Sequence, residues 1–318
     1  MLVALCLAAV AKAEPPLTVD SAVDLPKSAP AGEGSAAPDY PWPMLYPGQI
    51  TPQSPHWDLE LLYIQNRQDE GVVQARAALT AHPDDPELYW MLVRFMFEVG
   101  ERVPRSDTTF DKIAWYQEMV ALCETGLTLA PGHIHLRFAR GVANGRLGTT
   151  RGVLASLFLA KDMEQDWLDV ANSGFIYATP HAEELLPCDA HEALGVFYRL
   201  VPDWWIVSVL SGTRGSLEKS IHHLELANRC SGGRVIRERK ELAVSQICYG
   251  QHNGDDAMIQ AGLANLHLML TLPPHTDTEQ VDLKHGRMLL ADPSLACAYS
   301  RDGQQELDET TLKQPTAP

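Results

Sequence analysis

Positive charge, aromatic residues and long apolar runs are all scarce in this sequence. Lys and Arg number 25 against 41 Asp and Glu, a formal net charge of −16 that repels nucleic acids and anionic membranes. Aromatic residues make up only 7% of 318 residues and alternating apolar–polar runs are rare, so a β-rich fold is not expected. After the N-terminus, no segment reaches the ~20 apolar residues of a membrane-spanning helix. A 45% hydrophobic chain of this length can still bury a substantial core.

The motifs of common catalytic and cofactor sites are also missing. The 12 histidines include no His-Glu-x-x-His pair, and the adjacent His222 and His223 point about 100° apart on a helix, so they cannot readily share a metal. We expect the histidines, including His133 and His135, to be surface or capping residues. The glycine-rich segment 212–216 lacks the Walker lysine and the dinucleotide-binding spacing. The sequence therefore predicts no enzyme, no metal and no cofactor.

Clustered charges have structural explanations. The acidic pairs Glu183-Glu184 and Asp255-Asp256 are expected at helix starts, where they complement the helix dipole. One basic cluster is interleaved with acidic residues, which is typical of a solvated helix face rather than a binding patch. Its members are Arg234, Arg237, Arg239 and Lys240, with Glu238 and Glu241 between and beside them.

The first residues are typical of a secretory signal peptide. Leu2–Val10 is apolar, and Ala11-Lys12-Ala13 fits the small-x-small pattern that precedes cleavage. We therefore expect residues 1–13 to be removed and the mature chain to lie in the periplasm or another extracytoplasmic space. Cys6 follows Leu5, where a lipoprotein signal has a small residue, so ordinary cleavage is favoured over a lipid anchor.

Two segments outside the predicted folded domain are expected to be flexible. Residues 14–56 hold ten of the 22 prolines, which cannot donate backbone hydrogen bonds and block helix interiors, so this segment predicts an extended linker. The polar residues 301–318 predict a loose tail. Between them, residues 57–300 are expected to form one helical-repeat domain.

This central region shows helical periodicity with small residues at regular intervals, the pattern of tetratricopeptide-like repeats. In the first unit, the predicted helices Leu59–Gln65 and Glu70–Ala81 place Ala75 and Ala78 at their contact, before Pro83 ends the unit. The predicted fold class is all-α, with antiparallel helix pairs that form a superhelical or compact domain. An irregular helical bundle is the alternative.

Further helix pairs follow with less regular spacing, and long loops interrupt the second and fourth units. The second unit pairs Glu87–Val99 with Asp111–Leu129, and the third pairs His133–Leu147 with Gly152–Lys161 after a turn at Gly148. The fourth unit pairs a helix through Leu194, Gly195 and Tyr198 with a helix through Leu217, Ser220, Leu224 and Ala227. A further pair, Val235–Tyr249 with Asp255–Leu270, precedes a last helix near Glu279–Ala291.

Several segments together resemble the T-component (TatT-like) family associated with TRAP transporters. They are Gly126-Leu127-x-Leu129-Ala130-Pro131, Leu194-Gly195-x-x-Tyr198-Arg199-x-x-Pro202 and Ser216-Leu217-Glu218-Lys219-Ser220. The resemblance implies a periplasmic protein with divergent tetratricopeptide-like repeats, often lipid-anchored. It also implies association with a periplasmic solute-binding protein and an internal pore for an apolar ligand.

Five cysteines remain after the predicted cleavage, and some should pair in an oxidising compartment. Cys188 begins the first helix of the fourth unit and Cys230 ends its antiparallel partner, so these ends meet and a Cys188–Cys230 disulfide is predicted. Cys248 and Cys297 form a second predicted pair. Cys123, at a packing position, is expected to be a buried free thiol.

The long loop of the fourth unit is the predicted ligand-binding segment. It carries Trp204 and Trp205, which together with Tyr198 could surround an apolar pocket, with Arg199 and Arg214 as polar contacts. Alternatively, these aromatic residues fold back as a lid on the helical core.

The leading hypothesis is a non-enzymatic periplasmic binding protein, an accessory of a TRAP-type solute uptake system that handles an apolar small molecule. The alternative is a tetratricopeptide scaffold for protein–protein interaction in envelope assembly. The predicted partners are a solute-binding protein or another envelope protein, with a homo-oligomer as a further possibility and no nucleic acid.

Overall fold

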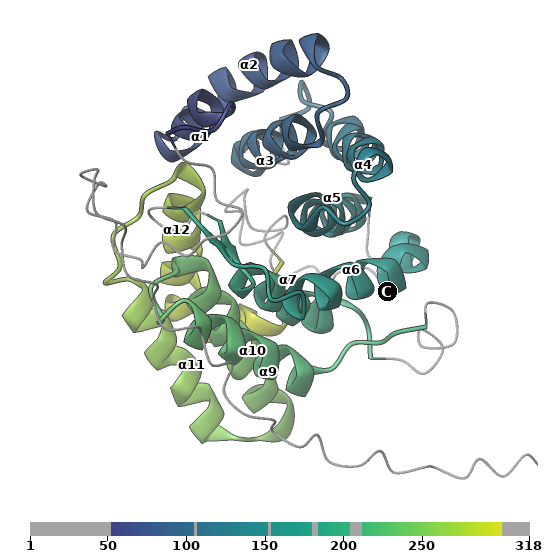
Figure 1. The fold of residues 1–318 in the computed structure, drawn as a ribbon. Coiled ribbons are helices and arrows are strands. Elements are labelled where there is room, and N and C mark those ends of the chain that lie inside the picture. The colour runs from purple at the N-terminus through teal and green to yellow at the C-terminus, as the bar shows by residue number, and fades with distance from the viewer. Residues whose placement is uncertain (1–51, 105–106, 152–153, 180–183, 204–211, 301–318) are drawn as a thin grey trace, which may run out of the picture.

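The computed structural model describes residues 52–104, 107–151, 154–179, 184–203 and 212–300. Within these ranges the chain is almost entirely helical, and successive helices run alongside one another (Figure 1). The all-α helical-repeat prediction is thus confirmed. The predicted signal peptide, most of the linker and the tail lie outside the described residues.

The helices occupy the following segments: α1 (Trp57–Ile64), α2 (Gln68–Ala81), α3 (Pro86–Arg102), α4 (Lys112–Leu129), α5 (Ile134–Arg151), α6 (Ala160–Ala171), α7 (Cys188–Leu200), α9 (Leu217–Cys230), α10 (Ile236–Asn253), α11 (Asp256–Met269) and α12 (Asp277–Ala291). Two 3₁₀ turns cover Leu154–Leu159 and Pro293–Ala298. A small antiparallel hairpin joins β1 (Tyr177–Ala178) to β2 (Leu185–Leu186), with Tyr177 opposite Leu186. None of the helices described here is long and apolar enough to cross a membrane.

Each helix packs on the next, and the series curves until its end meets its beginning (Figure 1). The start of α12 contacts α3, where Thr278 Oγ1 donates a hydrogen bond to Glu98 Oε2 at 2.7 Å. Arg102, at the end of α3, lies 3.5 Å from Asp277. The repeats therefore close into a ring rather than an open superhelix.

Small residues hold the helix pairs together, as the repeat pattern predicted. Gly195 of α7 lies against Leu224 of α9, and a Cβ at Gly195 would come within 2.9 Å of Leu224 Cδ2. A Cβ at Gly126 would lie 3.0 Å from Tyr89 Cβ, where α4 packs on α3. Larger side chains at either position would force neighbouring helices apart.

Helix starts follow the expected chemistry in most places. The Asp85 side chain accepts a hydrogen bond from Glu87 N, and Pro86 occupies the first helical turn. Asp255 caps α11, which confirms the prediction for that acidic pair. The prediction for Glu184 is wrong: this residue precedes β2, is buried and belongs to an ion-pair cluster.

The third repeat differs from its predicted form. A turn was expected at Gly148, but α5 continues to Arg151, and its partner α6 begins only at Ala160. An isolated glycine costs a helix only about 1 kcal/mol relative to alanine, so packing can override it. Gly148 is buried on the inner face of α5 and leaves room there for a cavity.

Candidate functional site

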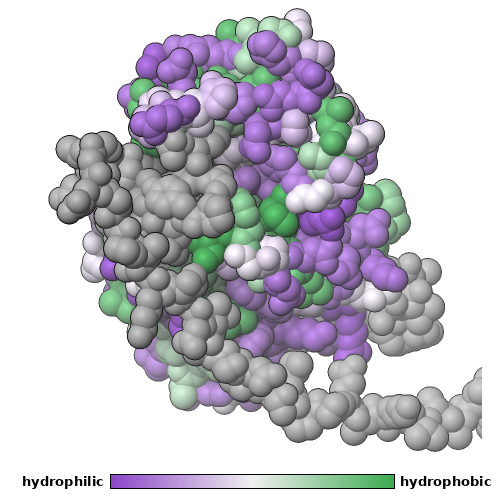
Figure 2. Space-filling view, in the orientation of Figure 1, coloured by the Kyte–Doolittle hydropathy of each residue, from purple (hydrophilic) through white to green (hydrophobic). Residues whose placement is uncertain are grey.

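The ring of helices surrounds a partly open cavity of about 240 Å³. Its walls come mainly from the inner faces of α3, α5, α6 and α7, with contributions from α10 and α12. Most of the lining is apolar. The space-filling view shows a mostly hydrophilic surface, with hydrophobic residues in the middle of the face that the ring surrounds (Figure 2).

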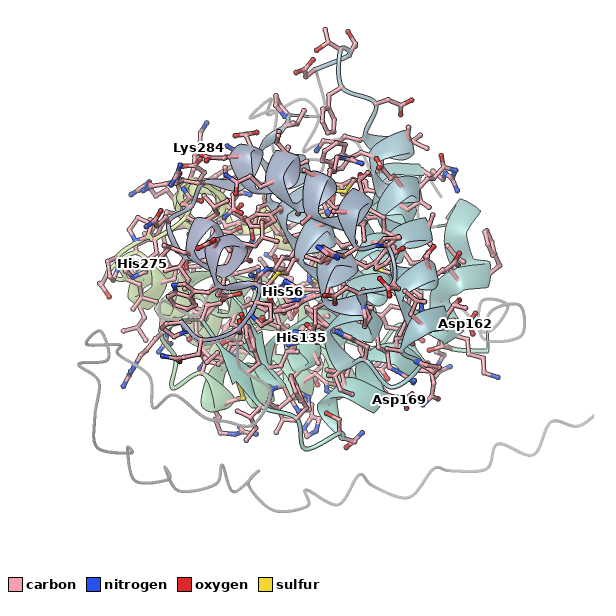
Figure 3. The ribbon with its side chains drawn as sticks, turned by 45° about the horizontal axis from the view of Figure 1, so that its top comes forward. His56, His135, Asp162, Asp169, His275 and Lys284 are labelled. Carbon is pink, nitrogen blue, oxygen red and sulfur yellow. A yellow bond between two sulfur atoms is a disulfide. The ribbon has the colours of Figure 1, made fainter. Side chains whose placement is uncertain are left out.

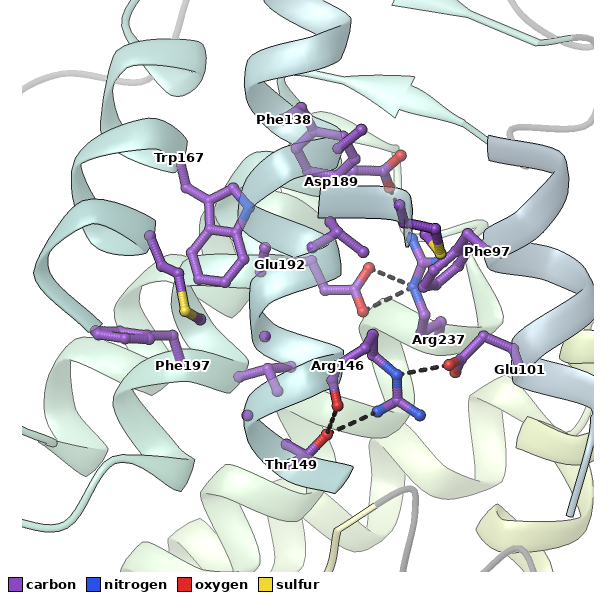
Figure 4. Close-up of a pocket in the computed structure, with 18 of the residues that line it drawn as sticks. Phe97, Glu101, Phe138, Arg146, Thr149, Trp167, Asp189, Glu192, Phe197 and Arg237 are labelled. Atoms are coloured by element: carbon purple, nitrogen blue, oxygen red, sulfur yellow. Dashed lines mark hydrogen bonds and ion pairs between the residues drawn. The ribbon is translucent and has the colours of Figure 1, made fainter. Parts of the chain in front are cut away.

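One side of the cavity is aromatic. Trp167 of α6 and Phe197 of α7 meet edge to face, with ring centroids 5.9 Å apart, and Met163 lies beside them (Figure 4). Trp167 fits because Gly141 of α5 has no side chain: a Cβ there would lie 2.6 Å from the indole Nε1. This side offers rigid, flat surfaces to an apolar molecule.

The opposite side carries charged groups (Figure 4). Arg237 of α10 donates from Nε to both carboxylate oxygens of Glu192, at 2.7 and 2.6 Å, and from Nη2 to Asp189 Oδ1 at 2.9 Å. Asp189 also accepts a hydrogen bond from Leu185 N at 2.7 Å, which ties α7 to the hairpin. Burial raises the pKa of Asp189 to about 7 against the opposing charge of Arg237, and burial also raises the pKa of Glu192.

A second ionic cluster lies at the wall formed by α3. The guanidinium of Arg94 is placed 4.2 Å from the Tyr63 ring and 4.4 Å from the Trp90 ring, and it pairs with Glu60. Arg94 Nη1 also donates to the Tyr177 hydroxyl at 3.0 Å. These contacts fix α1, α3 and the hairpin to one another, so this wall of the cavity is rigid.

His135 and Glu184 extend this cluster. His135 Nδ1 lies 2.9 Å from Glu184 Oε1, and the His135 ring stacks on Trp90. Burial alone would raise the pKa of Glu184, but the hydrogen bond and charge of His135, with Arg94, lower it. The expectation of a surface or capping role for His135 is wrong because the ring is buried in the interior, whereas Asp162 and Lys284 lie on the periphery (Figure 3).

The basic cluster of α10 is also not the solvated face that its sequence predicted. Lys240 is completely buried, with Nζ 2.5 Å from Asp282 of α12 and 3.0 Å from Glu241. Glu241 pairs in turn with Arg199, whose Nη1 donates to Tyr299 O at 2.6 Å. The partners of Lys240 and Glu241, and the carbonyl that holds Arg199, come from α7, α12 and the segment after the final 3₁₀ turn. The alternation of charges along α10 therefore gave no indication of them.

The predicted ligand residues do not come together in the described part of the chain. Arg199 lines the cavity. Tyr198 points elsewhere: its hydroxyl donates to Glu164 at 2.5 Å, and its ring stacks on His223. Arg214 is 58% exposed and lies 3.3 Å from Asp203 at the surface. Trp204 and Trp205 lie outside the described residues.

The two ends of the loop that carries these tryptophans are joined. Ser216 N donates to Tyr198 O at 2.9 Å, and Gly215 N donates to Pro202 O at 3.3 Å. A Cβ at Gly215 would lie 2.9 Å from the carbonyl carbon of Val201 and 3.0 Å from Tyr198 O, so the two chain segments can approach this closely only because residue 215 is glycine. The loop therefore leaves and re-enters the helical body at one point.

The structure brings both predicted cysteine pairs to disulfide-bonding distance. Cys188 and Cys230 join α7 to α9 with Cα atoms 5.5 Å apart, and Cys248 and Cys297 join α10 to the final 3₁₀ turn with Cα atoms 4.7 Å apart. Cys123 is free and buried, and burial raises the pKa of its thiol. Cys248, His252 and Cys297 are grouped closely enough to hold a metal ion, but a disulfide uses both sulfur atoms.

Sequence reasoning missed the main polar residues of the cavity, Asp189, Glu192 and Arg237. Asp189 and Glu192 are spaced i, i+3 and continue at helical intervals into Val196 and Leu200, so one stripe of α7 lines the cavity. Charged residues on the stripe that also carries apolar residues are a signal of buried, paired charge. This pattern could have indicated that Asp189 and Glu192 are buried. It could not have identified Arg237 as their partner, because Arg237 lies on another helix.

No family model and no curated protein matches this sequence. Among solved structures, the chain is similar to TTC0263, a thermophilic TPR protein of Thermus thermophilus, at 18% identity and a TM-score of 0.45, over 74% of this chain and 98% of that one. It is also similar to the MamA RS-1 ArsTM double mutant, at 14% identity and a TM-score of 0.39, over 66% of this chain and 91% of that one. The comparisons give no match that supports the resemblance to the TRAP T-component family.

Proposed function

We propose that this chain is a non-enzymatic, exported helical-repeat protein that binds an apolar small molecule in the cavity. The observation that carries the proposal is a largely apolar, partly open cavity of about 240 Å³, surrounded by a ring of helices and bordered by ionic clusters. For comparison, an apolar cavity of about 150 Å³ is enough to bind benzene. Cysteine pairs at bonding distance are compatible with an extracytoplasmic location.

Several polar groups of the cavity are held by hydrogen bonds to one another or to the backbone. The carboxylates of Asp189 and Glu192 both accept hydrogen bonds from Arg237. The Thr149 hydroxyl donates to the Arg146 carbonyl at 3.1 Å. Groups held in this way can shape the cavity and orient a ligand.

Binding can be tested with the apolar fluorescent probe N-phenyl-1-naphthylamine. We expect its fluorescence to rise on binding to the wild-type protein. Ala193→Phe places a large side chain on the cavity wall and should weaken binding at least about tenfold, because a filled cavity excludes the probe. Ala264→Phe, the same change on the exposed face of α11, is the matched control. Equal affinity in all three proteins would reject the cavity as the binding site.

A scaffold for protein–protein interaction is the second candidate, supported by the tetratricopeptide-like helix pairs. In that case the outer faces of the helices hold the partner, since α12 closes the ring on α3. A periplasmic solute-binding protein, as in a TRAP-type system, is the partner that the sequence resemblance suggests. Purification of the native protein from the envelope, with mass spectrometry of co-purifying lipids and proteins, separates the two candidates.

A further inference from the structure

Arg237 of α10 is a charged residue that lines the cavity. Its side chain is 22% exposed, whereas its partners Asp189 and Glu192 are only 3% and 7% exposed. Nε and Nη2 are occupied by the two carboxylates, but Nη1 has no hydrogen-bond partner among the described residues. Arg237 therefore brings an uncommitted N–H donor to the cavity lining, on an otherwise satisfied ion-pair cluster.

The carboxylates of this cluster offer little to a cationic ligand. Both oxygens of Glu192 accept from Arg237 Nε, and the two oxygens of Asp189 accept from Arg237 and from Leu185 N. Glu241, farther along the wall, is held by Arg199 and Lys240. An ammonium group would have to break these contacts before it could form its own.

An anionic ligand is disfavoured for a different reason. A carboxylate on Arg237 Nη1 would lie within a few ångströms of Asp189 and Glu192, which already balance or exceed the charge of the arginine. Burial raises the pKa of Asp189 to about 7, and an anionic ligand beside it would meet the same loss of hydration. An uncharged oxygen needs no free carboxylate and is not repelled by Asp189 and Glu192. It can still accept a hydrogen bond from Arg237 Nη1.

We propose that the cavity binds an apolar molecule with an uncharged carbonyl oxygen at one end, which accepts a hydrogen bond from Arg237 Nη1. The hydrocarbon part packs on the opposite wall, against Trp167, Phe197 and Met163. The charged and aromatic sides face each other across the cavity, which suits a molecule with one polar end (Figure 4). This inference rests on the proposed function and specifies the chemical class of the ligand.

The test compares four probes of equal chain length: octane, 2-octanone, octanoate and octylammonium. Each displaces N-phenyl-1-naphthylamine from the wild-type protein, and 2-octanone should bind at least about tenfold more tightly than either charged probe. Arg237→Lys keeps the positive charge between the two carboxylates but removes the planar donor. It should weaken 2-octanone about tenfold and leave octane unchanged. Arg229→Lys, on the exposed side of α9, is the matched control.

Three outcomes decide the inference. Tighter binding of octanoate or octylammonium, or an equal effect of Arg237→Lys on octane and 2-octanone, overturns it. If N-phenyl-1-naphthylamine and all four probes fail to bind, the proposed function itself fails. Should Arg237→Lys not fold, the infrared carbonyl stretch of 2-octanone bound to the wild-type protein decides: a hydrogen bond moves it below its frequency in octane, and an unchanged frequency overturns the inference.

Discussion

Helices α3 and α10 both lie in the interior, yet they are stabilised in different ways. α3 is surrounded mainly by apolar side chains, among them Trp90, Met91 and Phe95. α10 instead buries Lys240 and Glu241 in an ionic network. Both cysteine pairs also lie on the side of α7 to α12, whereas α4 carries the free Cys123. Both halves contain buried ion pairs, as Arg94 with Glu60 shows on α3, but the ionic half from α7 to α12 also contains the completely buried Lys240 and both cysteine pairs.

The largest expected effect is in the ionic half. Lys240→Met leaves Asp282 and Glu241 buried without the ammonium group, and should lower the free energy of unfolding by about 3–5 kcal/mol in urea titrations. The double variant Lys240→Met with Asp282→Leu also removes the Asp282 charge, while Glu241 keeps its pairing with Arg199, and should recover most of that loss. A loss below about 1 kcal/mol in the single variant would show that the network does not stabilise this half.

Removal of one cysteine pair should have the next largest effect. Replacing Cys188 and Cys230 by serine frees a loop of 42 residues and should cost about 2–4 kcal/mol. Hydrogen exchange should then accelerate in α7, α9 and α10 while α3 to α5 stay protected. Intact-mass measurement before and after reduction counts the disulfides. Alkylation of Cys188 without reduction would contradict the pairing.

The last effect concerns pH, and it is the smallest for a change of one pH unit. The raised pKa of Asp189 means that the folded chain keeps a proton that the unfolded chain has lost. Asp189 therefore lowers stability as pH rises from about 4 to about 7, by up to about 1.4 kcal/mol per pH unit. Asp189→Asn should remove this contribution and flatten the profile, measured by urea titration at several pH values. Identical slopes in both proteins would argue against the raised pKa.

The same comparison shows what the sequence could predict. Contacts that follow from helical spacing or from the antiparallel pairing of helices could be predicted from the sequence. Gly195 contacts Leu224 because both lie at the interface of one helix pair. Cys188 lies at the helix end that meets Cys230. Local propensity failed at Gly148, because packing on the inner face of α5 outweighs the low helix propensity of glycine.

Partners from distant segments were the main source of error. Lys240 is paired with a residue of α12, and Glu184 is paired with residues of α3 and α5. The residues next to them in the sequence therefore could not reveal that these charges are buried. For the same reason the cavity could not be located. Its polar wall combines α7 with α10, whereas the sequence directed attention to the loop after Tyr198.

The contact between α12 and α3 has a consequence for how such a chain can evolve. An open array of repeats tolerates duplication or loss of one unit, because only the neighbours of that unit are affected. Here an added or deleted helix pair would displace Thr278 from Glu98 and open the ring. We therefore expect a chain with one helix pair added or removed to lose this contact, whereas insertions in loops such as the one between α7 and α9 should leave it in place.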